Sequence, residues 1–350
     1  MVDNKIVVGI SQGDLNGIGL EIILKTLAEP GISEICVPVL FSSQKTVSYF
    51  RKMLSMDEFN FNPLRDFSQL NTKKPNVFIC YEEEVTIEMG KATTLSGKYA
   101  KLSLEAATLA LFEKKIDVLV TAPINKHSMQ EAGFNYPGHT EYLGDKLGGK
   151  PLMLLCANDL RVAVVTGHVP LKNISEKITI ENVLEKINQL YASLVKDFGI
   201  RKPKIAVLGL NPHAGENGAI GDEEKKMIIP AIEKAKENML VFGPYSADGF
   251  FGKNMQSQFD GVLAMYHDQG LIPFKTLAFG HGVNFTAGLD FVRTSPDHGT
   301  AYDIAGKQIA DESSFREALY TAIDIYRRRE LLEEISKKPL AFSPIKKERG

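Results

Sequence analysis

The chain has 350 residues, of which 44% are hydrophobic and 24% are charged, and this ordinary globular balance argues against a disordered or fibrous protein. Its formal net charge is −2, so it lacks the overall basic field that attracts nucleic acid or an anionic membrane. A chain of this length can form one large domain or two lobes with a substantial buried core.

The N-terminus does not resemble a secretory signal, because its apolar stretch IVVGI is short and polar residues follow it directly. No apolar run approaches the roughly 20 residues that span a bilayer. Three cysteines, Cys36, Cys80 and Cys156, are odd in number and far apart, which fits neither a disulfide framework nor a CxxC zinc site. We therefore expect a cytoplasmic protein with buried, reduced thiols.

Short β-branched runs alternate with longer helical patterns along the whole chain. Several of the predicted strands are almost wholly apolar, as expected for strands buried on both faces of a sheet. The predicted strands are Lys5–Gly9, Ile35–Phe41, Val77–Tyr81, Val118–Thr121, Leu152–Cys156, Val162–Thr166, Ile205–Leu210 and Val262–Tyr266. The clearest helix patterns are Ser96–Lys114, Thr179–Phe198 and Asp222–Asn238. This alternation predicts an α/β fold with a mostly parallel sheet flanked by helices.

A histidine follows three of the apolar runs within a few residues. The segments are RVAVVTGH, KIAVLGLNPH and DGVLAMYH, which end at His168, His213 and His267. Ligands in open α/β sheets bind outside the carboxyl ends of the strands, so three parallel neighbours would bring these imidazoles to one centre. Three neutral imidazoles suit Zn²⁺, Co²⁺, Ni²⁺ or Fe²⁺ and leave positions open for a substrate.

The alternative is that each histidine only caps a strand or donates to a backbone carbonyl. For a single histidine this alternative is the better one, and the recurrence of the same context three times favours a metal. His127 and His281 lack such a context and are predicted to lie at the surface or in loops. His139 and His298 lie in turn-like segments, where exposed polar residues are often functional.

Two further segments could bind an anion. The opening VVGISQGDLNGIGLEI reads as a strand, a turn and a helix, but its glycines match neither the dinucleotide fingerprint nor a P-loop. The helix N-terminus could favour an anion, and a plain tight turn is an equal alternative. Lys275, Asn284 and Arg293 would suit a phosphate or carboxylate, yet their spacing alone does not distinguish them from solvated surface residues.

Several longer motifs resemble those of the 4-hydroxythreonine-4-phosphate dehydrogenase family and occur in the order typical of it. The resemblance covers nearly the whole chain. The motifs are GDxxGIGxEI (Gly13–Ile22), TAPINK (Thr121–Lys126), PGHTEYL (Pro137–Leu143), TGHVPL (Thr166–Leu171), LNPHAGE (Leu210–Glu216), GPYSAD (Gly243–Asp248), YHDQG (Tyr266–Gly270) and GVNFTAGLDFVRTSPDHGTAYDIAG (Gly282–Gly306). In addition, HGTAYDIAGK (His298–Lys307) is similar to the adenine-nucleotide loop of isocitrate and isopropylmalate dehydrogenases.

The resemblance implies an isocitrate/isopropylmalate dehydrogenase-like fold, with two αβα lobes, mostly parallel sheets and the active site in the cleft between the lobes. The first lobe, on the cofactor side, would contain residues 1–125 and 275–335. The second lobe, with the metal and dimer contacts, would contain residues 126–274, and residues 336–350 would form a frayed tail.

The resemblance also implies roles for individual residues. Members of the family are homodimers whose active sites draw residues from both subunits, so the metal ligands can come from different chains. The implied metal ligands are His168, His213 and His267, and the implied substrate contacts are His139, Thr140, Lys275, Asn284 and Arg293. The implied cofactor loop contains His298, Gly299 and Ala305, and the general base is left open among Asp248, Asp268 and Lys275.

The implied activity is NAD-dependent oxidation and decarboxylation of 4-phosphooxy-L-threonine to 3-amino-2-oxopropyl phosphate, assisted by one divalent metal ion (Zn, Co or Mg), in pyridoxal 5′-phosphate biosynthesis. The sequence departs from the family pattern at Leu15, Asn16, Leu20 and Gly167, which bears on the substrate more than on the reaction class. A sister dehydrogenase for 4-phosphoerythronate or 4-phosphothreonate is one alternative. A metal-dependent hydrolase or an anion-binding protein is a more remote one.

Overall fold

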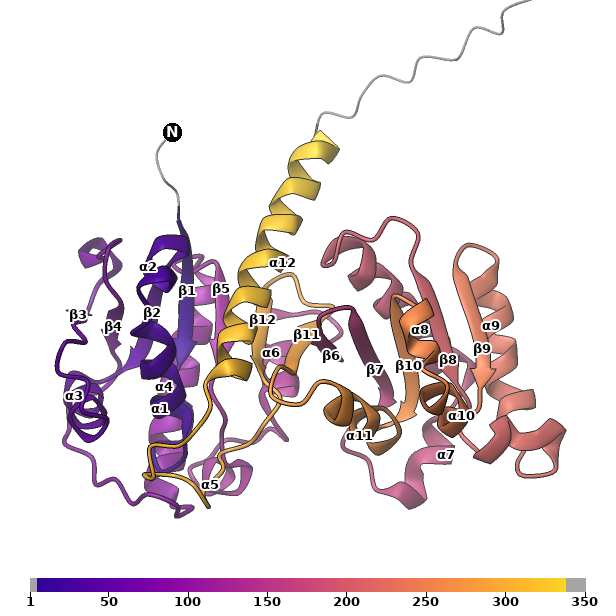
Figure 1. Cartoon of the computed structure of the whole chain (residues 1–350), viewed down its shortest axis with the longest axis horizontal. Coiled ribbons are helices and arrows are strands. Elements are labelled where there is room, and N and C mark those ends of the chain that lie inside the picture. Colours follow the sequence, from indigo (N-terminus) through magenta and orange to yellow (C-terminus); the bar gives the residue numbers. More distant parts are fainter. Residues whose placement is uncertain (1–4, 338–350) are drawn as a thin grey trace, which may run out of the picture.

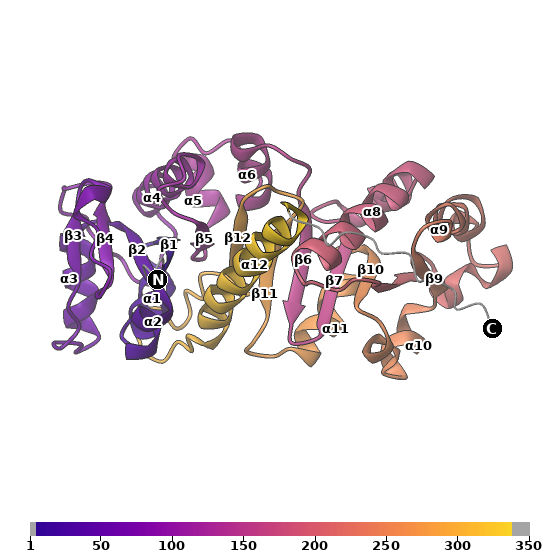
Figure 2. The ribbon, with the colours of Figure 1, turned by 90° about the horizontal axis from the view of Figure 1, so that it is seen from above.

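The computed structural model describes residues 5–337 and contains one long, twisted sheet with helices packed along it (Figure 1, Figure 2). The strand order is β3-β4-β2-β1-β5-β12-β11-β6-β7-β10-β8-β9. The strands are β1 (Ile6–Ser11), β2 (Cys36–Ser42), β3 (Asn62–Leu64), β4 (Asn76–Ile79), β5 (Val118–Thr121), β6 (Leu152–Ala157), β7 (Leu160–Thr166), β8 (Lys204–Leu208), β9 (Leu240–Tyr245), β10 (Gly261–Tyr266), β11 (Val283–Ala287) and β12 (Val292–Pro296).

The sheet consists of two parallel parts joined by an antiparallel centre. The pairs β12–β11, β11–β6 and β6–β7 are antiparallel, and the other neighbouring pairs are parallel. Because three antiparallel pairs separate them, β1 and β10 would point in opposite directions if the sheet were flat. Neighbouring strands rotate by roughly 20–25°, so the six steps from β1 to β10 add roughly 120–150° of twist. This twist brings the carboxyl ends of both parallel parts toward the same side of the molecule.

Helices cover both faces of the sheet. In the first part α4 packs on β1, β2 and β5, and α12 packs on β5, β11 and β12; in the second part α8 and α11 both pack on β7 and β10. The helices are α1 (Gly19–Leu27), α2 (Pro30–Ile35), α3 (Gln44–Met53), α4 (Thr94–Phe112), α5 (Lys126–Glu131), α6 (His139–Leu147), α7 (Ile174–Lys177), α8 (Ile180–Lys196), α9 (Ile229–Lys236), α10 (Ala247–Gly252), α11 (His267–Leu277) and α12 (Ser313–Lys337). Within residues 5–337, no helix combines the length and the apolar character that a membrane span requires.

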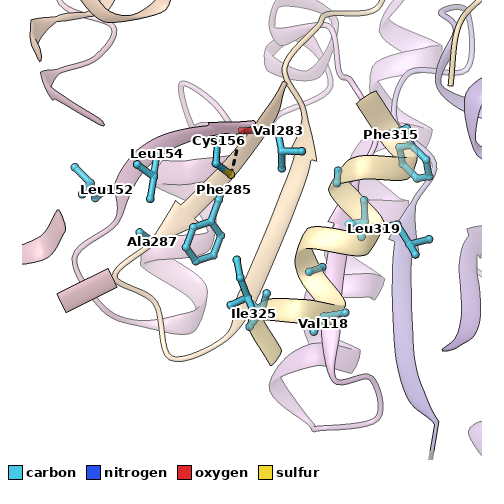
Figure 3. Packing of buried hydrophobic residues seen from close by; sticks show 14 of the residues in the cluster. Val118, Leu152, Leu154, Cys156, Val283, Phe285, Ala287, Phe315, Leu319 and Ile325 are labelled. Atoms are coloured by element: carbon cyan, nitrogen blue, oxygen red, sulfur yellow. Dashed lines mark hydrogen bonds between the residues drawn. The ribbon is translucent and has the colours of Figure 1, made fainter. Parts of the chain in front are cut away.

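The largest core cluster is continuous through the antiparallel centre of the sheet. Phe285 on β11 is fully buried beside Leu154 of β6, and Phe315 and Leu319 of α12 belong to the same cluster. Figure 3 shows Leu154 and Phe285 on the two strands and Phe315 and Leu319 on the neighbouring helix. Because apolar burial is the main favourable term in folding, this shared core is what makes the two parallel parts one body.

The α/β fold with a mostly parallel sheet is confirmed. Each of the eight predicted strands corresponds to an observed one, with identical ends at Val118–Thr121 and shifted ends at the other seven. The sequence patterns missed β3, β9, β11 and β12, because Pro, Gly or polar residues interrupt their apolar character. The predicted helix Asp222–Asn238 begins instead with a π-helical turn, Glu224–Ile228, which continues into α9. Cys36 and Cys156 are buried and Cys80 is partly buried, and all three are free.

The division into two lobes stays a prediction, and the sheet is continuous across the proposed boundary, which falls between β11 and β6. Helix α12 extends to Lys337, two residues into the range predicted as a tail. The rest of that range, residues 338–350, lies outside the described part of the chain.

Replacing Phe285 with Ala should lower the free energy of unfolding by about 3–5 kcal/mol, because the substitution leaves a cavity in the shared core. Urea denaturation measures this loss. Phe112, which is 59% exposed on α4, provides the control, and Phe112→Ala should stay within about 0.5 kcal/mol of the unsubstituted protein. Equal effects of the two substitutions would contradict the central role of the shared core.

Candidate active site

A cavity of about 260 Å³ opens where the carboxyl ends of β5, β7, β10 and β12 meet. Nine of the thirteen predicted site residues line it: His139, Thr140, His168, His267, Lys275, Asn284, Arg293, His298 and Gly299. His213, Asp248, Asp268 and Ala305 do not line it. Residues that are distant in the sequence therefore converge here, as expected for the ligand edge of an α/β sheet.

His168 and His267 lie side by side at one end of the cavity. Their strands, β7 and β10, are parallel neighbours with Thr166 opposite Tyr266. Both histidines lie within two residues of this pair, and their ring centroids are 5.6 Å apart. Asp268 Oδ1 lies 2.7 Å from Nδ1 of His267. A carboxylate at this nitrogen favours the tautomer with hydrogen on Nδ1 and leaves Nε2 as the free ligand atom.

Lys126 is a residue of this site that the sequence patterns did not single out. It is the first residue of α5, just beyond β5, and its Nζ lies 3.4 Å from His168 Nε2. Burial lowers the pKa of the His168 imidazole, and the positive charge of Lys126 lowers it further. His168 is therefore neutral, which is the form that binds metals. Its position after the carboxyl end of a predicted strand was the signal that could have identified Lys126.

Arg293 lies in the wall of the cavity and is almost fully buried. Its Nε and Nη2 donate to Thr121 Oγ1 at 3.1 and 2.5 Å, and its Nη1 donates to Thr286 Oγ1 at 3.0 Å. Burial lowers the pKa of Arg293 to about 9, and the negative charge of Glu141 opposes this shift. The two hydroxyls hold a cation whose charge is not neutralised by hydrogen-bonded carboxylates, and this suits an anionic ligand.

Three polar atoms of cavity-lining residues are buried without a hydrogen-bond partner in the described part of the chain. They are Nε2 of His139, Oδ1 of Asn284 and Nε2 of His298. Buried polar atoms are normally satisfied, so such atoms at a cavity indicate a missing ligand or water. Lys275 also faces the cavity, and its Nζ donates to the Asp297 carbonyl at 2.9 Å.

His139 is not the exposed turn residue that its local sequence predicted. It is the first residue of α6 and is partly buried, because the helix turns its imidazole inward beside the cavity. Burial lowers the pKa of His139 well below 6.5, and the positive charges of Arg293 and Lys126 add to the effect. His139 is therefore a neutral hydrogen-bonding group at neutral pH.

The predicted cofactor loop is tied to the turn between β1 and α1. The backbone N–H of Ile18 donates to the Thr300 carbonyl at 3.0 Å, and the Tyr302 hydroxyl donates to Asp14 Oδ2 at 2.9 Å. Burial raises the pKa of the Asp14 carboxyl. His298 Nε2 is buried without a partner among residues 5–337, whereas Ala305 lies outside the cavity.

His213 is held away from the other two histidines within one chain. In residues 5–337, no group of three His, Cys, Asp or Glu residues is placed to hold a metal. β8 pairs with β10, but after β8 the chain enters the turn Pro212–Gly218, and His213 on this turn does not line the cavity. Of the remaining candidates, Asp248 is the second residue of α10 and lies outside the cavity, and a hydrogen bond from the Ser246 hydroxyl lowers the pKa of its carboxyl.

The turn that carries His213 has an unusual backbone. His213, Ala214, Gly215, Glu216 and Asn217 all have positive φ values, between 41° and 78°. Left-handed helical backbone costs about 1–2 kcal/mol for each residue other than glycine. Such strain persists only where surrounding contacts impose it, and it is concentrated at functional sites.

Comparison with known proteins agrees with this fold and site. The model of the family described as pyridoxal phosphate biosynthetic protein PdxA matches residues 34–322. A 4-hydroxythreonine-4-phosphate dehydrogenase of Bacteroides thetaiotaomicron is 48% identical over 351 residues, which covers 99% of this chain and 95% of that protein. A putative D-threonate 4-phosphate dehydrogenase of Oceanobacillus iheyensis is 40% identical and covers 93% of this chain and 99% of its own length.

Solved structures lead to the same family. The crystal structure of a 4-hydroxythreonine-4-phosphate dehydrogenase from Klebsiella pneumoniae has a TM-score of 0.77 and 34% identity, covering 92% of this chain and 98% of that one. An isocitrate dehydrogenase from Methylococcus capsulatus shares the fold alone, with a TM-score of 0.50, 13% identity and coverage of 95% and 89%. The chain is thus an α/β enzyme of the oxidoreductase class. It belongs to the family of pyridoxal phosphate biosynthetic protein PdxA.

The neutral state of His139 predicts a dependence of stability on pH. Below pH 6.5, His139 binds a proton in the unfolded chain but stays neutral in the folded chain, so the free energy of unfolding should fall as the pH decreases. His139→Gln should flatten the slope of unfolding free energy against pH by up to about 1.4 kcal/mol per pH unit. Urea denaturation between about pH 7 and pH 5.5 measures this slope. His127→Gln, on the exposed face of α5, should keep the original slope, and an unchanged slope in His139→Gln would contradict the buried neutral state.

Proposed function

We propose that this chain oxidises 4-phosphooxy-L-threonine with NAD⁺ and that the oxidised product loses CO₂ to give 3-amino-2-oxopropyl phosphate, in pyridoxal 5′-phosphate biosynthesis. The observation that carries the proposal is the cavity itself, where two imidazoles face Lys126, Lys275 and Arg293. The names of the relatives support the substrate. A phosphorylated amino acid has two anionic groups and a hydroxyl, which match this combination of cations and neutral donors.

The residues of the cavity would have separate roles in this reaction. Lys126, Lys275 and Arg293 would bind the phosphate and carboxylate, and His139 and Asn284 would hydrogen-bond to the substrate beside Thr140. The hydride leaves C3 for the nicotinamide of NAD⁺, whose nucleotide would lie along His298, Gly299 and Ala305. The hydroxyl proton leaves to a base, for which Asp268 and Lys275 are the candidates nearest the cavity and Asp248 is a third. The resulting 3-oxo acid then releases CO₂ from C1, and a proton returns to C2.

A divalent metal ion (Zn, Co or Mg) fits part of this site. His168 is neutral, and Asp268 leaves Nε2 of His267 free, so both can serve as ligands. When bound, the ion would polarise the C3 hydroxyl and the later carbonyl. His213 would be the third ligand. Because it lies apart from His168 and His267 within one chain, we propose a homodimer in which the partner subunit completes the set. The location that the sequence predicts for this homodimer is the cytoplasm.

A sister activity is the second candidate. The Oceanobacillus relative is named for a phosphorylated sugar acid, D-threonate 4-phosphate, and a dehydrogenase acting on 4-phosphothreonate or 4-phosphoerythronate would use the same anion contacts. The two activities differ at C2, where the substrate carries an amine or a hydroxyl. A metal-dependent hydrolase or an anion-binding protein would need no nicotinamide, so NAD titration distinguishes these remote alternatives.

Assays of NADH formation with both substrate types should give a kcat/KM at least about 10-fold higher for 4-phosphooxy-L-threonine, because the site must distinguish the amine from a hydroxyl. The enzyme is the same preparation in both assays. A higher value for the phosphorylated sugar acids would establish the sister activity instead. Failure to bind NAD would reject both dehydrogenase proposals.

His213→Ala should lose metal-dependent turnover by at least about 100-fold while keeping its unfolding transition, because a ligand to the ion is removed. Steady-state kinetics and metal stoichiometry measure the effect. His127→Ala, an exposed histidine of α5, is the matched control. Full activity of His213→Ala with unchanged stoichiometry, or activity that survives exhaustive EDTA treatment, would reject the metal site.

A further inference from the structure

The turn that carries His213 is wrapped around a buried carboxylate. Glu224 is only 2% exposed, and its Oε1 accepts the backbone N–H groups of Leu210 at 2.8 Å and Asn211 at 2.7 Å. Its Oε2 accepts the Asn211 side-chain amide at 3.0 Å. The carboxylate thus holds two successive backbone groups immediately before Pro212, where the left-handed run is about to begin.

The fit around this carboxylate is close. A Cβ atom placed on Gly215 would lie 2.5 Å from Glu224 Oε2, and one placed on Gly209 would lie 3.1 Å from Oε1. The left-handed turn therefore brings its own backbone into contact with the carboxylate, and only glycine fits at Gly215. A second contact anchors the start of the turn, since Gln269 Nε2 donates to the Gly209 carbonyl at 2.6 Å.

Glu224 has no lysine or arginine within ion-pair distance among residues 5–337. A buried carboxylate is costly unless hydrogen bonds compensate it, and here the compensating donors all belong to the segment before His213. Glu224 also begins the π-helical turn at Glu224–Ile228, an irregularity that is frequent at functional sites. The buried charge of Glu224, the strained backbone of residues 213–217 and the π-helical turn therefore lie in contact with one another.

We propose that Glu224 is a positioning residue, whose carboxylate imposes the left-handed turn at residues 213–217 and so sets the direction of the His213 imidazole. The proposal rests on the proposed function, in which His213 is a ligand. Glu224 itself does not line the cavity and touches no reacting atom. Its effect on turnover passes through His213.

The test compares Glu224→Gln with Glu233→Gln, a control on the exposed side of α9. The amide of Glu224→Gln keeps the shape of the side chain and one acceptor oxygen, but it removes the negative charge and places an NH₂ group against the Asn211 side-chain amide, so the hold on the turn should weaken. NMR of histidine-labelled protein should show the His213 signal shifted or broadened in Glu224→Gln, with the His168 and His267 signals in place. The kcat should fall by about 10–100-fold with little change in the KM for NAD. Glu233→Gln should match the unsubstituted protein in both measurements.

Two results would overturn the proposal. One is a His213 signal that is unchanged in Glu224→Gln, whatever the activity. The other is movement of all the histidine signals together with loss of the unfolding transition, which would show that Glu224 supports the whole fold. His213→Gln, used to assign the signal, separates this inference from the proposed function. If His213→Gln were fully active, the ligand role of His213 would fail, and the His213 signal alone would still decide whether Glu224 sets the turn.

Discussion

The antiparallel centre of the sheet is the constraint on which the rest of the structure depends. Strands β12, β11, β6 and β7 reverse direction at each step, and they join two parallel parts that would otherwise be separate sheets. The accumulated twist then turns the carboxyl ends of both parts toward one cavity. The fully buried Phe285 packs in the core that these strands share with α12 and so contributes to this connection.

The electrostatic character of the cavity follows from that convergence. The first part of the sheet contributes Lys126 and Arg293, and the second contributes His168 and His267. Burial lowers the pKa of the His139 and His168 imidazoles, and the nearby positive charges lower it further, so both are held in their neutral form. A site that combines fixed cations with neutral imidazoles is prepared for an anion beside a metal or a proton acceptor.

The backbone strain at His213 is coupled to a buried carboxylate. The left-handed turn at His213 is unfavourable by itself, and it is held by a carboxylate that is also unfavourable when buried alone. Each feature compensates the other, since the turn supplies the N–H groups that the carboxylate accepts.

The sequence by itself determined the α/β class, the strands with apolar runs and the polar residues that follow those strands. It did so because burial on both faces demands near-continuous apolar residues, and ligand sites lie just beyond such strands. The family motifs added Lys275, Asn284 and Arg293, which spacing alone did not distinguish. Only the tertiary structure decided that β11 and β12 lie at the centre of the sheet, that Arg293 is buried and His139 partly buried at the cavity, and that His213 lies apart from His168 and His267 within one chain. These outcomes depend on strand pairing, twist and contacts between residues far apart in sequence, which no local pattern encodes.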